Sequence, residues 1–314
     1  MTYNQLWKRL TVIYNEREAQ AIVRTVLDAL FGMSLTDICL GKVTQLSADD
    51  TTRLEKIMQR LEKSEPVQYV LGAEWFAGRL FDVAPGVLIP RPETEDLVKW
   101  ACDEAKEKEK EDNSKEERGK EEKEVSKKGE EAPHPSILDI GTGSGCIAIT
   151  VALALPQARV TAWDISTDAL AIAAGNAHRL GASVRFEHQD ALSAPDDEER
   201  WDVIVSNPPY ICDKERADMS DNVLSYEPEL ALFVPDSDPL LFYRAITRYA
   251  SKALKPGGRL LFETNTAYAH EVAQVMADEG FTAIEVRNDC FGKPRMVKGA
   301  FFKGKKVKKR LTPL

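Results

Sequence analysis

The sequence predicts an α/β protein with a doubly wound, mostly parallel seven-stranded sheet, preceded by a small N-terminal helical bundle and a β-hairpin linker. Three observations predict this fold. From residue 135 onward, short β-branched runs alternate with segments of helical periodicity. Residues 1–66 show helical periodicity alone, and residues 67–92 hold two strand-like runs around a glycine.

Residues 1–66 are expected to form a helical substrate-recognition domain. Its segments with apolar residues at helical spacing are "NQLWKRLTVIY", "EAQAIVRTVLDALFG", "SLTDICLG" and "SADDTTRLEKIMQRLEK". Ser34 and Ser47 stand where helix-capping residues are expected, and Gly32 stands at a helix end. The segment has no histidine and one cysteine, so we expect recognition or packing there rather than chemistry.

Residues 67–92 are predicted to be a β-hairpin and hinge, with "EWFAG" and "RLFDV" on either side of the turn at Gly78. The remaining residues, 93–314, form the main domain, in which Thr94 is expected to cap a helix that ends near Trp100.

Two charged segments depart from this pattern. Residues 103–131 hold 13 acidic and 9 basic side chains with almost no apolar ones. We expect a solvated, flexible insertion without a functional site, and a helix rich in Glu–Lys pairs is the alternative. Residues 303–314 are a basic tail, "KGKKVKKR" followed by the last four residues, expected to be a solvated extension.

Composition excludes several classes of protein. The chain has 314 residues with a net charge of −9, and this acidic character argues against direct nucleic-acid binding outside the tail. Its five scattered cysteines include no CxxC pair, which suits a reducing cytoplasm, and no metal site is predicted. The N-terminus lacks the apolar core of a signal peptide. The longest apolar run, "CIAITVALAL", is about half of what a membrane span needs, so no membrane partner is expected.

The main domain alternates strands with helices. The predicted strands are "SILDI", "RVTAWDI", "SVRFEHQD", "WDVIVS", "GGRLLFET", "FTAIEVRND" and "RMVKGAFF". Ligands of open α/β sheets bind at the carboxyl ends of the parallel strands, so the residues that follow these strands are the candidates for a site.

The first strand runs into "DIGTGSGC", where Gly141, Gly143 and Gly145 open a helix. A dinucleotide-binding loop would have glycine or alanine where this chain has Cys146, and the GK[ST] of a phosphate-binding loop is absent. The pattern fits a nucleoside ligand without a pyrophosphate, or simply a tight strand-to-helix turn.

Acidic residues end the next two strands. Asp164 lies 23 residues after Gly141, a distance at which a carboxylate commonly binds ribose hydroxyls, although a helix cap before Thr167 is an alternative. Asp190 ends the third strand, either as a cap or as a contact to the edge of an adenine ring.

The fourth strand ends in Asn207-Pro208-Pro209-Tyr210. Each proline has a fixed φ and no N–H, and each holds the residue before it extended, so the tetrapeptide should be stiff. The glycine loop, the two aspartates and Asn207 are therefore expected to meet in one crevice.

With these motifs in place, the chain resembles a known family. "ILDIGTGSG", "WDIS.DAL..A..NA" and "VSNPPY" are similar to the signatures of class I S-adenosylmethionine-dependent methyltransferases, which have a Rossmann-like fold. "PVQYVLGAEWFAG", "VLIPRPETEDLV" and "YEPELAL" resemble the HemK/PrmC family, and the likeness covers nearly the whole chain.

The resemblance implies methyl transfer from S-adenosyl-L-methionine to the side-chain amide of the glutamine in the GGQ motif of class I peptide-chain release factors, affecting translation termination. S-adenosyl-L-homocysteine would be the other product. The catalytic residues implied are Asn207, Pro208, Pro209 and Tyr210. The cofactor-binding residues implied are Gly141, Thr142, Gly143, Ser144, Gly145, Asp164, Asp190, Ala191 and Asn207. The insertion and the tail depart from the family pattern, and Ala191 stands where some members have a bulky aromatic residue.

This chemistry gives a role to three groups of the tetrapeptide. The side-chain oxygen of Asn207 and the carbonyl of Pro208 are expected to accept both amide hydrogens of a glutamine, with Tyr210 stacked on the amide plane. No histidine is needed as a base. Arg91, Glu93 and Glu227 border the crevice or serve a hinge.

Three alternatives remain. A nucleic-acid exocyclic-amine N-methyltransferase would use the same NPPY motif but would favour a basic face or a large target-recognition domain. A non-catalytic binding module would have a damaged glycine loop or tetrapeptide, and both are intact. A dehydrogenase is disfavoured by Cys146 and by NPPY.

Overall fold

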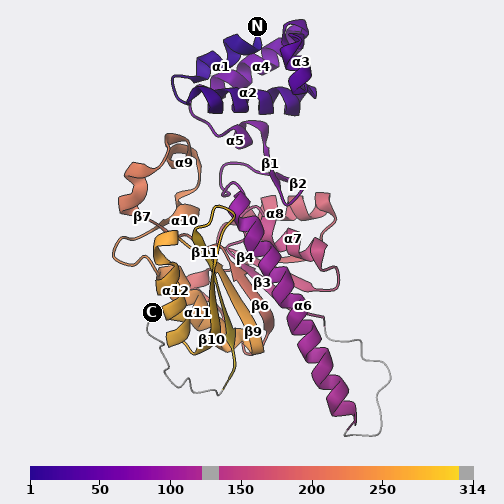
Figure 1. The fold of residues 1–314 in the computed structure, drawn as a ribbon, viewed down its shortest axis with the longest axis vertical. Coiled ribbons are helices and arrows are strands. Elements are labelled where there is room, and N and C mark those ends of the chain that lie inside the picture. The colour runs from indigo at the N-terminus through magenta and orange to yellow at the C-terminus, as the bar shows by residue number, and fades with distance from the viewer. Residues whose placement is uncertain (122–133, 304–314) are drawn as a thin grey trace.

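The structure is a computed structural model that describes residues 1–121 and 134–303. A helical bundle stands at one end of an elongated molecule, a larger α/β body forms the other end, and a β-hairpin lies between them (Figure 1). No helix in the described ranges is long and apolar enough to cross a lipid bilayer.

The N-terminal bundle has its own apolar core, as its helical periodicity predicts. Its helices are α1 (Tyr3–Leu10), α2 (Glu16–Phe31), α3 (Leu35–Cys39), α4 (Ala48–Leu61) and α5 (Val67–Leu71). Ser34 and Ser47 accept hydrogen bonds from backbone amides at the starts of α3 and α4, and Gly32 ends α2 with a positive φ, as expected. Residues 67–71, predicted as part of the linker, instead form α5, because Val70 packs into the bundle core.

The hairpin is confirmed and consists of β1 (Ala73–Phe76) and β2 (Arg79–Asp82). It docks on the body through Phe76 and Phe81, which are buried in the body's core. Asn176 of α8 (Thr167–Leu180) also pairs with the backbone N–H and carbonyl of Asp82. The hairpin is thus attached to the body by both apolar packing and hydrogen bonds.

The body is built on a seven-stranded sheet in the order β10-β11-β9-β6-β3-β4-β5. The strands are β3 (Ser136–Ile140), β4 (Arg159–Asp164), β5 (Val184–His188), β6 (Trp201–Ser206), β9 (Leu254–Glu263), β10 (Phe281–Asn288) and β11 (Pro294–Phe301). The pairs among β3, β4, β5, β6 and β9 are parallel, whereas β11 runs antiparallel to both β9 and β10. The predicted doubly wound, mostly parallel sheet is confirmed.

Helices cover both faces of this sheet (Figure 1). They are α6 (Pro92–Glu121), α7 (Cys146–Ala154), α8, α11 (Leu241–Ala253) and α12 (Ala269–Asp278). One buried cluster joins α6, α7 and α8 to the strands, and a second joins α11 and α12 to the strands. The loop after β6 adds the short pair β7 (Ile211–Cys212) and β8 (Phe233–Val234), with α9 (Asp221–Tyr226) and α10 (Glu229–Leu232) between them.

The charged segment 103–131 was expected to be a solvated insertion, with a helix as the alternative, and the helix is found over residues 103–121. Helix α6 continues through them, and Glu104 and Lys108 are buried. Their charges are paired with residues of the sheet: Glu104 with Arg259 and Lys298, and Lys108 with Asp202. The composition of the segment does not reveal these partners, because they lie on strands that are distant in the sequence. The remainder of the segment and residues 304–314 of the tail lie outside the described residues.

Candidate active site at the carboxyl edge of the sheet

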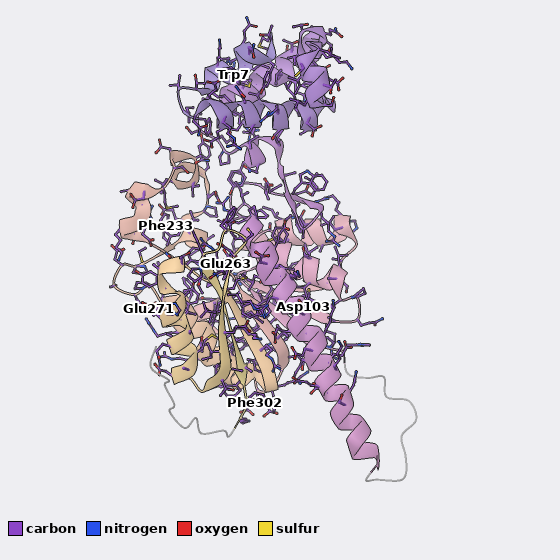
Figure 2. The ribbon with its side chains drawn as sticks, in the orientation of Figure 1. Trp7, Asp103, Phe233, Glu263, Glu271 and Phe302 are labelled. Atoms are coloured by element: carbon purple, nitrogen blue, oxygen red, sulfur yellow. The ribbon has the colours of Figure 1, made fainter. Side chains whose placement is uncertain are left out.

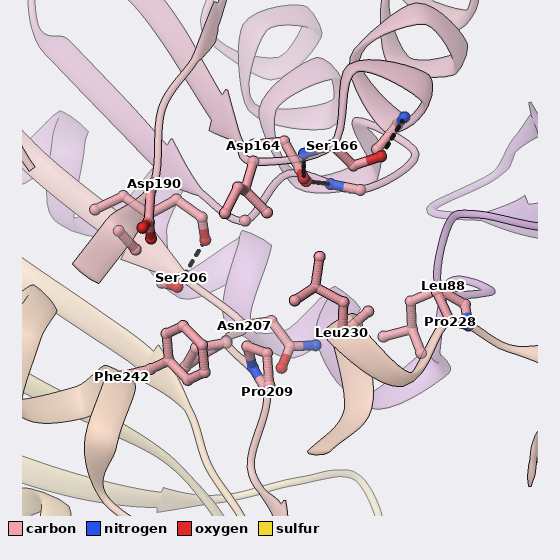
Figure 3. Close-up of a pocket in the computed structure, with 18 of the residues that line it drawn as sticks. Leu88, Asp164, Ser166, Asp190, Ser206, Asn207, Pro209, Pro228, Leu230 and Phe242 are labelled. Atoms are coloured by element: carbon pink, nitrogen blue, oxygen red, sulfur yellow. Dashed lines mark hydrogen bonds between the residues drawn. The ribbon is translucent and has the colours of Figure 1, made fainter. Parts of the chain in front are cut away.

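A cavity of about 310 Å³ opens at the carboxyl ends of β3, β4, β5 and β6 (Figure 3). Its walls bring together most of the residues that the sequence singled out. These are Gly141, Gly143, Asp164, Asp190, Ala191, Asn207, Pro208 and Pro209. Four others do not line it, namely Thr142, Ser144, Gly145 and Tyr210. The expected convergence on one crevice is therefore found, with the remaining four residues in supporting positions.

The three loop glycines serve different purposes. Gly141 and Gly143 have φ of 78° and 54°, and a side chain at either would meet no atom within 4 Å. They bring the backbone to the cavity in a conformation that other residues rarely adopt. Gly145 has no place on the cavity wall: a Cβ there would lie 2.7 Å from Ile149 Cδ1 and 3.1 Å from Ala173 Cβ. Gly145 lets α7 pack closely on α8.

Asp139 supports the loop from below. Its Oδ2 atom accepts hydrogen bonds from the Thr142 hydroxyl at 2.6 Å and from the Ala148 N–H at 3.2 Å. Its Oδ1 atom is buried and has no hydrogen-bond partner among the described residues. Burial raises the pKa of Asp139 to about 7. Thr142 thus holds the loop on a buried carboxyl group rather than facing a ligand.

Asp164 joins the loop to the second strand. Its Oδ2 accepts from the Gly143 N–H at 2.8 Å, and its Oδ1 accepts from the Ser166 N–H at 2.9 Å. Ser166 is the N-cap of α8, so the cap that the sequence offered as an alternative for Asp164 belongs to Ser166. The Asp164 carboxylate remains on the cavity wall, in the upper part of Figure 3.

Asp190 and Ala191 form the wall after β5. Asp190 caps the 3₁₀ turn that follows it by accepting from the Leu192 N–H at 2.8 Å. It lines the cavity as well, and its contact to an adenine ring stays a prediction. Helix α11 supplies Phe242 and Ile246 to the same cavity. Sequence analysis missed Phe242, which projects into the cavity on the same side as Asp190 (Figure 3).

Asn207 follows β6 at the lower side of the cavity in Figure 3. Its amide nitrogen, Nδ2, donates to the Thr94 hydroxyl at 3.5 Å. Among the described residues, neither its Oδ1 atom nor the Pro208 carbonyl receives a hydrogen bond. Two adjacent acceptors are therefore available at the cavity.

Tyr210 and Thr94 lie behind the cavity wall and meet at Glu263. The Tyr210 hydroxyl donates to Glu263 Oε1 at 3.3 Å, and the Thr94 hydroxyl donates to Glu263 Oε2 at 2.7 Å. Thr94 lies inside α6, which begins at Pro92, so its predicted role as a helix cap is wrong. Its side chain is buried, and its hydroxyl donates to Glu263 at the end of β9. No sequence pattern marked Glu263.

Arg91 and Glu227 join two of the sequence motifs. Arg91 Nη2 lies 2.6 Å from Glu227 Oε1, and the Ile89 N–H donates to Glu227 Oε2 at 3.3 Å. Neither charged residue lines the cavity, but Leu88, three residues before Arg91, and Pro228, next to Glu227, do. The pair thus fastens "IPRPETE" to "YEPELAL" at the rim, which supports the hinge interpretation over a direct ligand contact.

Comparison with known proteins identifies the family to which this chain belongs. The model "Methyltransferase small domain" matches residues 127–226, and the model "PrmC N-terminal domain" matches residues 4–72. A release factor glutamine methyltransferase of Bacteroides thetaiotaomicron is 44% identical over 286 residues, covering 91% of this chain and 94% of that protein. A release factor glutamine methyltransferase of Flavobacterium psychrophilum is 37% identical over 297 residues, covering 95% and 97%. The chain belongs to the HemK/PrmC family of methyltransferases.

Proposed function

We propose that this protein transfers a methyl group from S-adenosyl-L-methionine to the side-chain amide nitrogen of the glutamine in the GGQ motif of class I peptide-chain release factors. The observation that carries the proposal is the pair of unoccupied acceptors, Asn207 Oδ1 and the Pro208 carbonyl, at the cavity. A primary amide presents two N–H donors in one plane, and two adjacent acceptors suit it. Membership of the family supports the same substrate class.

The residues present fit S-adenosyl-L-methionine, which supplies a methyl group on a sulfonium centre when bound. The cavity volume of about 310 Å³ lies within the range of small-ligand sites. Gly141 and Gly143 allow close approach of a ligand to the loop, and Asp164 is placed to accept from ribose hydroxyls. Asp190 and Phe242 would border the adenine ring, with Phe242 as the aromatic wall that Ala191 cannot provide.

Asn207 and Pro208 would orient the substrate glutamine. An amide nitrogen is a weak nucleophile, and positioning it against the methyl donor makes the reaction effectively unimolecular. The partial negative charge on the two acceptor oxygens stabilises the positive charge that develops on nitrogen. The methylated amide cation is acidic enough to lose its proton to water, so no side-chain base is required. Stacking of Tyr210 on the amide stays a prediction, since its hydroxyl is bonded to Glu263.

The N-terminal bundle is the part of the chain that we assign to recognition of the release factor. The Tyr226 hydroxyl, next to the Arg91–Glu227 pair, donates to the Lys63 carbonyl at 2.7 Å and so connects the bundle to the loop over the cavity. Such an enzyme would act in the cytoplasm and affect translation termination. A nucleic-acid exocyclic-amine N-methyltransferase is not favoured, because relatives that match over 94% and 97% of their length bear the glutamine methyltransferase name.

A labelling experiment tests the proposal. The protein is incubated with S-adenosyl-L-methionine carrying a labelled methyl group and with a class I release factor, in parallel with a release factor whose GGQ glutamine is replaced. Label is expected in the first substrate only. Equal labelling of both substrates, or of neither, would refute the proposed function.

Replacing Asn207 tests the site itself. Asn207→Ala removes the side-chain acceptor, so we expect the turnover number to fall by at least about 100-fold. The Kd for S-adenosyl-L-methionine, measured by calorimetry, should change by less than about threefold. Asn288→Ala, an exposed asparagine in β10, is the matched control and should retain full turnover. Unchanged turnover in Asn207→Ala would contradict the acceptor role.

A further inference from the structure

A chain of hydrogen bonds runs from Asn207 into the interior of the body. Asn207 Nδ2 donates to Thr94 Oγ1 at 3.5 Å, and Thr94 Oγ1 donates to Glu263 Oε2 at 2.7 Å. Thr94 is 3% exposed and Glu263 is 1% exposed, and neither lines the cavity. Figure 2 shows Glu263 inside the larger body, in its upper half. The contact between Asn207 and Thr94, at 3.5 Å, is the longer of the two.

The number of hydrogens in this chain determines which way the Asn207 amide faces. An ionised carboxylate only accepts, so Thr94 must give its single hydroxyl hydrogen to Glu263. The Thr94 oxygen is then left with lone pairs alone. The end of the Asn207 amide that faces it must therefore be the NH₂ group, and the carboxamide oxygen is left for another partner.

We propose that Thr94 and Glu263 are positioning residues that fix the orientation of the Asn207 carboxamide, so that its oxygen accepts from the substrate amide. This inference rests on the proposed function. The two ends of a carboxamide have nearly the same size, so packing does little to distinguish a 180° flip. In the flipped state an NH₂ group would face the NH₂ group of the substrate, and the productive arrangement would be lost.

Several charged or titratable groups surround Glu263. They are Glu93 on α6, Cys146 on α7, Tyr210 after β6, Tyr243 on α11 and Arg295 on β11. Burial raises the pKa of Glu263, while the hydrogen bonds from Thr94 and Tyr210 and the charge of Arg295 act in the opposite direction. Arg295 is itself paired with Asp289 at 2.9 Å.

Protonation of Glu263 would reverse the direction of the hydrogen bonds that run through Thr94. A neutral Glu263 can donate to Thr94, which frees the Thr94 hydrogen for Asn207 Oδ1 and favours the flipped amide. Because the pKa of Glu263 is raised, this happens at a higher pH than for an ordinary glutamate. The turnover number should therefore fall as the pH is lowered through the pKa of Glu263 in the folded protein.

Substitution of Thr94 separates orientation from packing. Thr94→Val keeps the shape but removes the hydroxyl, and we expect the turnover number on a release factor to fall about tenfold, with the Kd for S-adenosyl-L-methionine within about twofold of wild type. Thr94→Ser restores the hydroxyl and should recover turnover to within about twofold. Thr150→Val is the matched control, because the Thr150 hydroxyl is buried without a hydrogen-bond partner among the described residues. Full turnover in Thr94→Val, or a loss in Thr94→Ser as large as in Thr94→Val, would overturn the proposal.

The pH profile supplies a readout that a purely structural role would not move. At saturating cofactor and substrate, wild type and Thr150→Val should show an acid limb, that is, a fall of the turnover number as the pH is lowered. Thr94→Val should show no such fall. Asp139→Asn, measured in parallel, identifies any limb that Asp139 contributes. An acid limb that persists unchanged in Thr94→Val would refute the coupling to Glu263. If wild type labels no release factor, the proposed function fails; if it does and Thr94→Val behaves as wild type, this inference alone fails.

Discussion

Asp164 shows how one carboxylate serves both the loop and the cavity. Two backbone N–H groups, from Gly143 and Ser166, each donate to one of its oxygens, which leaves the remaining lone pairs directed elsewhere. Asp139 is the contrasting case, with one oxygen bonded twice and the other buried without a partner. The same residue type thus lines the cavity in one position and lies buried beneath the loop in the other.

Removing the charge of Asp164 should weaken cofactor binding. In Asp164→Asn an NH₂ group replaces one acceptor oxygen, so we expect the Kd for S-adenosyl-L-methionine to rise about ten- to hundredfold. Calorimetry measures this Kd. Asp168→Asn, an exposed position in the first turn of α8, is the matched control and should bind as wild type does. An unchanged Kd in Asp164→Asn would contradict the assigned ribose contact.

At the scale of elements, the contact of α7 with α8 depends on the absence of a side chain at Gly145. Gly145→Ala would place a Cβ 3.1 Å from Ala173 Cβ of α8 and 2.7 Å from Ile149 Cδ1 of α7, at a φ of 82°. We therefore expect a loss of about 1–3 kcal/mol in the free energy of unfolding. Gly175→Ala is the control, since Gly175 is exposed inside α8 and its Cβ would meet nothing within 4 Å. That variant should gain up to about 1 kcal/mol, because alanine favours helices. Urea denaturation measures both, and a neutral Gly145→Ala would show that α7 can shift.

Helix α6 is held on the sheet by buried charge pairs. Glu104 accepts from Lys298 at 2.5 Å and from Arg259 at 3.2 Å. Glu104→Ala would leave these cations without their buried partner, and we expect a loss of about 3–5 kcal/mol in the free energy of unfolding. Asp103→Ala, at the exposed neighbour labelled in Figure 2, should change it by at most about 0.5 kcal/mol. Equal effects of the two substitutions would contradict the assigned pairing.

For the whole molecule, the buried Asp139 makes stability depend on pH. Its pKa is raised from 3.8 to about 7, so the folded protein binds this proton more tightly than the unfolded chain does. The resulting stabilisation is fully present below the unfolded value and is lost as the pH rises through about 7. The free energy of unfolding should therefore fall between about pH 4 and about pH 7, and by less in Asp139→Asn. Parallel slopes for the two proteins would exclude this origin.

Much of the fold was predictable because it is encoded locally. The capping serines, the alternation of strands and helices, the glycine loop and the aspartates after β4 and β5 depend on neighbours within a few residues. The parallel topology then brings the strand ends to one edge, so the convergence of Gly141, Asp164 and Asn207 also followed from the pattern.

Tertiary structure alone decided the rest, since the decisive contacts join residues far apart in the chain. Thr94 and Glu263 are 169 residues apart, and Arg91 and Glu227 are 136 residues apart. No periodicity links such positions, so the sequence could only present Thr94 as a helix cap. By itself the sequence determined that Gly141, Asp164 and Asn207 meet at one cavity, but not that Phe242 completes its wall. Only the packing of α6 against β9 decided what lies behind Asn207. The role of the Thr94 hydroxyl and the Glu263 carboxylate depends on the hydrogen-bond partners that this packing brings to them.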